Sequence, residues 1–314
     1  MKKIVIILLC VCTFAQAQNQ KQEKMENKTT LRLIYPQWQG GVVAHWIPDI
    51  PADDVSRGYY LGAHLLNYLA PENGQQTIEV PVSLDINDRT EENGIHSYQV
   101  ILRQTKDALN ILEENHPERI VTLGGDCAVS VVPFTYLANK YAEDVAIVWI
   151  DAHPDVTLPY DDYKGYHAMA LTACLGMGDK EIMDMLPGKV DASRAIIVGL
   201  RSWDEGMKER QNQLGIKGIS PSEVADNSAV ILEWLKNTGV SKVIIHFDMD
   251  VLDPAEIIAA VGTDPDGMKI EQVVRVINDI AGEYDVVGLT VAEPMPHVAM
   301  KIKNMLKQLP LLGQ

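Results

Sequence analysis

The residues best suited to chemistry stand in two acidic segments, Asp151-Ala-His153-Pro-Asp155 and Asp248-Met-Asp250, and each follows a run of apolar residues. Alternate side chains of an extended segment lie on one face, so the acidic residues within each segment are expected to converge. Carboxylates gathered in one site cannot all stay ionised unless a cation offsets their repulsion. Oxygen donors with an imidazole therefore indicate a divalent-metal site, which we expect to be binuclear and to belong to a metal-dependent hydrolase.

The apolar runs before these segments belong to an alternation of strand and helix patterns that begins at Leu31. Most of the strand patterns are continuous Val, Ile and Leu runs, which are typical of parallel strands covered on both faces. This alternation predicts a doubly wound, mainly parallel sheet flanked by helices. Strands are expected at Leu31–Tyr35, Thr77–Val80, Arg119–Leu123, Val145–Ile150, Arg194–Leu200, Lys242–Phe247 and Asp285–Val291. Helices are expected at Tyr59–Leu69, Ser97–Asn115, Val129–Tyr141, Asp179–Met185, Pro221–Lys236, Lys269–Ala281 and Pro296–Leu309.

Chemically capable residues follow four of these strands. They are Gly124-Gly-Asp-Cys127, the segment that begins at Asp151, the segment that begins at Asp248, and Glu293. Sites in such folds form at the carboxyl ends of the strands, so these residues are expected at one edge of the sheet.

The order of these motifs resembles that of the arginase/agmatinase (ureohydrolase) family. The family signature is Gly-Gly-Asp-His, then Asp-Ala-His-x-Asp, then Ser-x-Asp-x-Asp-x-x-Asp-Pro, followed by a Glu after the last core strand. The resemblance extends from about Leu31 to Leu309. It implies a three-layer α/β/α fold, two bridged Mn²⁺ ions, and a hydroxide between them that hydrolyses a guanidino group to urea and an amine.

The resemblance also implies a role for each matching residue. The implied metal ligands are Asp151, His153, Asp155, Asp248 and Asp250, with Asp151 and Asp248 bridging the two ions. Cys127, at the position of a further family ligand, is predicted to be the sixth. His167 matches the histidine that passes protons to the leaving amine, and Glu293 matches the acid that orients the guanidinium. The alternative for Glu293 is an ion pair with Arg201. Asp126 is expected in a loop or capping role, and Asp253 in a turn.

Cys127 departs from the family pattern, because it stands where the family usually has a metal-binding His. A thiolate ligand would shift the metal preference from Mn²⁺ toward Zn²⁺, Fe²⁺ or Co²⁺. Two alternatives stay open: Cys127 is a plain buried thiol, or it forms a disulfide with Cys174.

Two further departures concern the substrate and the strand before Asp248. Thr157 replaces an Asn that binds the amino-acid end of arginine, and Asp161 and Asp162 in the next loop would repel a carboxylate, although Lys164 or Tyr163 could receive one. We therefore expect a cationic guanidine or amidine without that carboxylate as the substrate.

His246 stands where the family has a small Ser. We favour a packed strand histidine there over a residue that orients a ligand.

The N-terminus has the three parts of a secretory signal peptide: Lys2 and Lys3, an apolar stretch, and Ala15-Gln-Ala17. Residues 1–17 are therefore expected to be removed, residues 18–29 to form a disordered leader, and residues 30–314 to form one catalytic domain of an exported protein.

The net charge of −16 argues against nucleic acid and anionic membrane partners, and it suits a cationic substrate. The resemblance implies a homo-oligomer.

Two other functions compete with this reading. A zinc deacetylase-like hydrolase is expected to have one zinc and a paired-His centre, and no His-His pair occurs in the chain. A non-catalytic protein would keep the scaffold with an impaired metal site.

Overall fold

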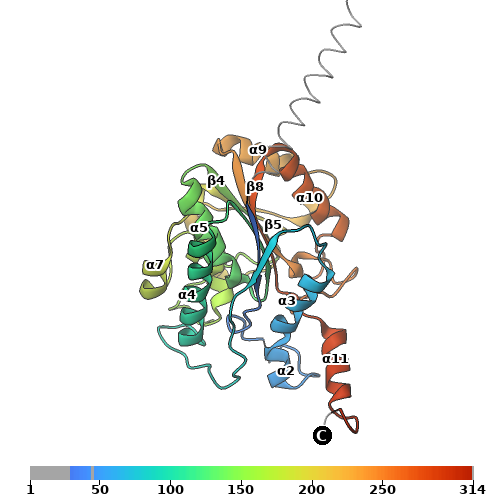
Figure 1. Ribbon diagram of the computed structural model, residues 1–314. Helices are drawn as coiled ribbons and strands as arrows, with labels where there is room; N and C mark the ends of the chain where they lie inside the picture. The colour runs from blue at the N-terminus through green and yellow to red at the C-terminus, as the bar shows by residue number, and fades with distance from the viewer. Residues whose placement is uncertain (1–28, 44–45, 313–314) are drawn as a thin grey trace, which may run out of the picture.

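The computed structural model describes residues 29–43 and 46–312, and within them one sheet of eight parallel strands forms the centre (Figure 1). The order across the sheet is β2-β1-β3-β8-β7-β4-β5-β6. The strands are β1 (Thr30–Tyr35), β2 (Gln76–Glu79), β3 (Arg119–Gly124), β4 (Val145–Ile150), β5 (Ala195–Val198), β6 (Lys217–Ile219), β7 (Lys242–Asp248) and β8 (Asp285–Ala292).

Helices cover both faces of this sheet, which confirms the expected three-layer α/β/α fold (Figure 1). The α-helices are α2 (Ala52–Ser56), α3 (Gly58–Leu69), α4 (Tyr98–Asn115), α5 (Val131–Tyr141), α6 (Ala170–Cys174), α7 (Lys180–Met185), α8 (Glu205–Leu214), α9 (Ala229–Thr238), α10 (Ile270–Glu283) and α11 (His297–Leu306). Short 3-10 helices are η1 (Cys127–Ser130), η2 (Tyr166–Met169), η3 (Ala192–Arg194), η4 (Pro221–Val224) and η5 (Met249–Val251). None of the described helices is long and apolar enough to cross a membrane.

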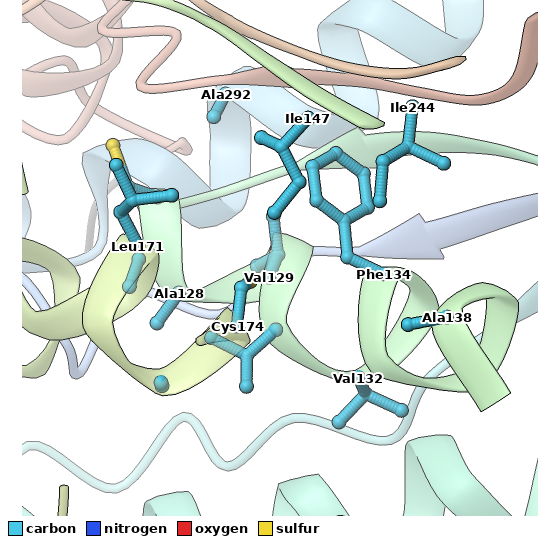
Figure 2. Close-up of a cluster of buried hydrophobic side chains, with 14 of the residues drawn as sticks. Ala128, Val129, Val132, Phe134, Ala138, Ile147, Leu171, Cys174, Ile244 and Ala292 are labelled. Carbon is cyan, nitrogen blue, oxygen red and sulfur yellow. The ribbon is translucent and has the colours of Figure 1, made fainter. Parts of the chain in front are cut away.

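The alternation of side chains along the strands divides the core between the two faces. In β4, Ile147 and Trp149 pack toward α4 and α5, whereas Val148 and Ile150 pack toward α9 and α10. Figure 2 shows Phe134 of α5 pointing toward Ile147 of β4 and Ile244 of β7. Each face of the sheet is therefore anchored by its own apolar cluster, which explains the continuous apolar runs in the sequence.

The observed elements correct the sequence prediction at a few places. Strand β6 was not predicted, because three residues at the sheet edge are too short to show a pattern. The helices α2, α6 and α8 were also missed. The predicted helix Pro221–Lys236 is wrong as one unit: it is divided into η4 and α9, because Asn227 accepts a hydrogen bond from Ala229 N and so competes with helix continuation.

The strand order brings together the four strands that precede the chemical residues. β3, β8, β7 and β4 are consecutive neighbours in the middle of the sheet, and all run in the same direction. Their carboxyl ends therefore lie side by side, although the residues that follow them are far apart in the chain. The predicted signal peptide, and the predicted leader apart from Thr29, lie outside the described residues.

We expect Phe134→Ala to lower the free energy of unfolding by about 3–5 kcal/mol, because it leaves a cavity between α5 and the sheet. Val298→Ala, at a largely exposed position on α11, is the control and should change stability by less than about 0.5 kcal/mol. Urea unfolding followed by circular dichroism measures both. Similar losses in the two variants would contradict this assignment of the core.

Candidate metal centre

Cys127 begins the 3-10 helix η1 directly after β3. The preceding Gly125 is required because a Cβ there would lie 1.7 Å from the carbonyl oxygen of Gln37. Asp126 accepts hydrogen bonds from Ala128 N at 3.0 Å and Gly40 N at 2.8 Å, which agrees with the expected capping role. The capped turn directs the Cys127 thiol inward, where Sγ lies 2.8 Å from Asp248 Oδ2.

Asp151 follows β4 and is fixed from two sides. Trp149 Nε1 donates to its Oδ2 at 2.8 Å, and His153 N donates to its Oδ1 at 2.6 Å. The ring of His153 turns toward β7, with Nδ1 2.9 Å from Asp250 Oδ2. Two strands that are adjacent in the sheet therefore contribute the acidic residues of one buried cluster, as the sequence predicts.

Two groups of potential metal ligands share Asp151. In the first, ligand atoms of Cys127, Asp151, Asp155 and His246 all lie within 4.8 Å of one another. In the second, those of Asp151, His153 and Asp250 do so. A carboxylate common to both groups is placed as a bridging ligand would be.

Asp248 belongs to neither group, although it contacts the first one. Its Oδ2 meets the Cys127 thiol, and its Oδ1 accepts from Asp250 N at 2.6 Å. All six predicted ligands therefore come together, but the bridging role of Asp248 stays a prediction. Asp253 lies apart in a turn and accepts from Ala255 N, as expected.

One carboxylate of the first group is placed to suit a cation. The Oδ2 atom of Asp155 is buried and has no hydrogen-bond partner among the described residues. Asp155 also has a φ of 50°, a left-handed conformation that is costly for a residue other than glycine. A buried oxygen without a partner, next to a thiol and a second carboxyl group, fits a divalent ion.

Burial and crowding shift the pKa values of these groups strongly. Burial first, and then the charge of Asp250, raise the pKa of Asp151 to about 6. Burial and neighbouring carboxylates also raise the pKa of Asp248 and of the Cys127 thiol well above their usual values. Burial opposes charge on Asp250 too, yet the His153 ring outweighs it and lowers its pKa to about 2. The centre therefore takes up protons when no cation is present.

Glu293 and His167 form a second polar cluster beside the thiol. Glu293 Oε1 lies 3.2 Å from His167 Nδ1 and accepts from Cys127 N at 3.1 Å. Tyr59 donates its hydroxyl hydrogen to Glu293 Oε2, and Tyr163 OH lies 2.7 Å from His167 Nε2. Burial opposes charge on His167, but Tyr163 and Glu293 outweigh it and raise its pKa well above the usual value. His167 is therefore positioned as a proton donor.

The structure excludes one of the alternative roles considered for Glu293 and one of those considered for Cys127. Arg201 does not pair with Glu293; its guanidinium donates to backbone carbonyls, including those of Asp250 at 2.9 Å and Val251 at 3.2 Å. Cys127 and Cys174 are both free thiols, so they form no disulfide. Arg201 thus supports the turn that carries Asp250.

The loop after the first acidic segment corrects one sequence argument. Asp161 is not a free charge that repels carboxylates, because Arg210 binds both of its oxygens, at 2.5 and 2.9 Å. Lys164 does not extend toward a ligand either: Nζ donates to the carbonyls of Pro159 at 3.1 Å and Asp161 at 2.6 Å. Both cations of this region are therefore used to hold the loop.

Sequence reasoning also missed residues that hold the site together. Tyr59 comes from helix α3, far along the chain from Glu293, and no motif marks it. Ser130, which lies 2.8 Å from His246 Nδ1, follows Cys127 by three residues in η1. That spacing of three residues, close to one helical turn, is the only sequence signal that could have placed Ser130 near the site.

The chain is similar in sequence to known proteins. The model of the arginase family matches residues 66–306. Arginase from Staphylococcus aureus (strain MRSA252) is 26% identical over 202 residues, which cover 56% of this chain and 65% of that protein. The chain thus matches less than two thirds of the length of that relative. N(omega)-hydroxy-L-arginine amidinohydrolase from Streptomyces lavendulae is 30% identical over 203 residues, or 62% of this chain and 70% of that protein.

The fold is also similar to that of solved structures. Entamoeba histolytica arginase in complex with L-ornithine superposes with a TM-score of 0.69 at 17% identity, covering 88% of this chain and 94% of that one. At this identity the likeness concerns the fold.

We expect the metal-free protein to lose stability as the pH rises from about 5.5 to 7.5. Asp151 binds protons more tightly in the folded chain (pKa about 6) than in the unfolded chain (about 3.9), so its contribution to the free energy of unfolding falls from about pH 4 and is nearly lost by about pH 7. Burial first, and then the charge of Glu293, raise the pKa of Asp126 to about 7, which extends the fall across the range of pH 5.5 to 7.5. The raised pKa of His153 acts in the same direction, whereas burial lowers the pKa of His246 to about 3 and opposes this loss up to about pH 6.5. Asp250, with a lowered pKa, has finished titrating below this range.

Thermal unfolding of chelator-treated protein measures this effect. Added divalent metal should raise the melting temperature more at pH 7.5 than at 5.5, and Asp151→Asn should flatten the pH dependence. A metal-free protein that becomes more stable toward pH 7.5 would contradict the account.

Proposed function

The chain belongs to the arginase family, and from that premise we propose that it is a metal-dependent hydrolase of guanidino or amidino compounds. The reaction would cleave a C–N bond and release urea or a related product. The observation that carries the proposal is the pair of ligand groups that share Asp151, with the His167–Glu293 pair adjacent to one of them.

The residues present fit two divalent ions. Cys127, Asp151 and Asp155 would hold one ion, Asp151, His153 and Asp250 the other, with Asp248 between them. Bound ions would supply a nucleophile from water at neutral pH, which the unreactive guanidinium carbon requires. Mn²⁺ is the ion that the family implies, and the Cys127 thiolate also suits Zn²⁺, Fe²⁺ or Co²⁺.

His167 would donate a proton to the leaving amine. Tyr163 and Glu293 raise its pKa against the effect of burial, which favours the protonated ring, and Tyr163 OH contacts its Nε2. Glu293 provides the negative charge that attracts the guanidinium. Tyr59 and Cys127 N keep this carboxylate in one orientation, and its left-handed φ of 61° shows that the backbone is constrained there as well.

The substrate that we propose is a cationic guanidine or amidine that lacks the carboxylate of L-arginine. The support for this substrate differs from the sequence argument. It is no longer repulsion of a carboxylate by Asp161, but the lack of an available cation in the described loop of residues 156–165. Lys164 is the single cation in residues 156–165, and both it and Arg210 are engaged by the loop. Thr157 is buried and presents a hydroxyl at the position where the family has an Asn.

We expect purified protein loaded with Mn²⁺ to release urea from a guanidino substrate, and Asp155→Asn to lower kcat/KM at least about 100-fold. The variant replaces a carboxylate whose buried Oδ2 has no hydrogen-bond partner among the described residues, so the bound metal content should fall with the activity. Asp162→Asn, at an exposed acid in the same region, is the control and should keep both. Full turnover by Asp155→Asn, or by chelated protein, would refute the proposal.

We also expect kcat/KM for agmatine to exceed that for L-arginine by at least about tenfold, since one missing charge pair in a binding site changes affinity by that order. Steady-state assays on agmatine, arginine and guanidinobutyrate measure the preference. Lys164→Met should change the agmatine and arginine values alike, because Nζ is bound to carbonyls. An arginine preference that Lys164→Met abolishes would show instead that Lys164 binds the carboxylate.

A further inference from the structure

His246 is buried in the middle of the sheet, directly beneath the candidate metal centre. It lies on β7 between Trp149 of β4 and Thr290 of β8 in the strand register. Its ring stacks on Trp149 at a centroid distance of 3.6 Å, with 10° between the ring planes. Two residues further along β7, Asp248 points to the same face of the sheet. The position is therefore packed, as expected, but it also adjoins the ligands.

The two ring nitrogens of His246 have different surroundings. Nδ1 lies 2.8 Å from Ser130 Oγ, whereas Nε2 is buried and has no hydrogen-bond partner among the described residues. Buried ring nitrogens are usually satisfied, because an unpartnered one loses its hydration without compensation. Nε2 therefore requires a partner other than a neighbouring side chain.

His246 itself belongs to the first ligand group. One ligand atom each of His246, Cys127, Asp151 and Asp155 lies within 4.8 Å of the other three. Asp155 Oδ2 is likewise buried and without a partner, and it comes from a different segment of the chain. Two residues of one ligand group, from different segments of the chain, thus each carry a buried donor atom without a partner among the described residues.

We propose that His246 Nε2 is a ligand of the divalent ion held by Cys127, Asp151 and Asp155. With the Nδ1 proton donated to Ser130 Oγ, the lone pair of Nε2 is free for the ion, and Ser130 orients the ring. The neutral nitrogen limits the negative charge of a set that already contains a thiolate and two carboxylates. This mixed set favours Zn²⁺, Fe²⁺ or Co²⁺ at this position over Mn²⁺.

The inference rests on the metal binding in the proposed function but not on the reaction, so Co²⁺ itself is the probe. Full-length protein is stripped with a chelator, titrated with Co²⁺, and followed by visible absorption. His246→Phe keeps a planar ring on Trp149 and removes both nitrogens; it should weaken binding at the Cys127 position at least about tenfold and alter the thiolate-to-cobalt absorption band. Ser130→Ala should have a smaller effect on affinity.

A control histidine separates ligand loss from general damage. His297→Gln changes a ring that bonds to the backbone of Ala260, outside both ligand groups, and should leave the cobalt spectrum unchanged. Unchanged cobalt affinity and spectrum in folded His246→Phe would overturn the proposal. Failure of the unaltered protein to bind Co²⁺ would overturn both this proposal and the proposed function, whereas cobalt binding through His246 without urea release would overturn only the latter.

The unaltered protein supplies a second readout if His246→Phe does not fold. The Nδ1 proton of a cobalt-bound His246 is buried against Ser130, so proton NMR should show a strongly shifted, slowly exchanging N–H signal. Ser130→Ala should move this signal or speed its exchange. Absence of such a signal in cobalt-loaded protein, or its indifference to Ser130→Ala, would contradict the assignment.

Discussion

The arrangement depends on the burial of like charges at the ends of four adjacent parallel strands. Asp151, Asp155 and Asp248 are all nearly inaccessible to solvent and lie close to the Cys127 thiol. In the absence of a cation, burial and mutual repulsion raise the pKa values of these acids. The apolar layers on both sides of the sheet hold the strands in register, so the acids cannot separate to relieve the repulsion.

The local sequence predicted most of the fold, and which acids the structure brings together, because both depend on short-range patterns. Continuous apolar runs marked seven strands, and acids at their carboxyl ends marked the centre. The sequence could not show contacts between distant residues. Asp161 pairs with Arg210, which is 49 positions away, and Glu293 accepts a hydrogen bond from Tyr59, which is 234 positions away. The neighbouring sequence therefore made Asp161 look like an unpaired charge, and it gave no sign that Tyr59 holds Glu293. The edge strand β6 was too short to detect.

The two departures from the family pattern near the ligands meet in one group. Cys127 and His246 are far apart in the chain, yet their ligand atoms lie within 4.8 Å of each other. Taken separately, the cysteine predicted a ligand that shifts the metal preference away from Mn²⁺, and the histidine predicted a packing residue. Taken together, the thiol of Cys127 after β3 and the imidazole of His246 on β7 belong to one group of potential metal ligands. The role of either residue is therefore difficult to assign from its own segment of the sequence.

The central claim is that two cations occupy this cluster and share Asp151. Anomalous X-ray scattering from crystals of the metal-loaded protein tests it most directly. We predict two anomalous peaks, one bounded by Cys127, Asp155 and His246, the other by His153 and Asp250, both within bonding distance of Asp151. A map without peaks in this cluster, or with its metal bound elsewhere on the protein, would contradict the account.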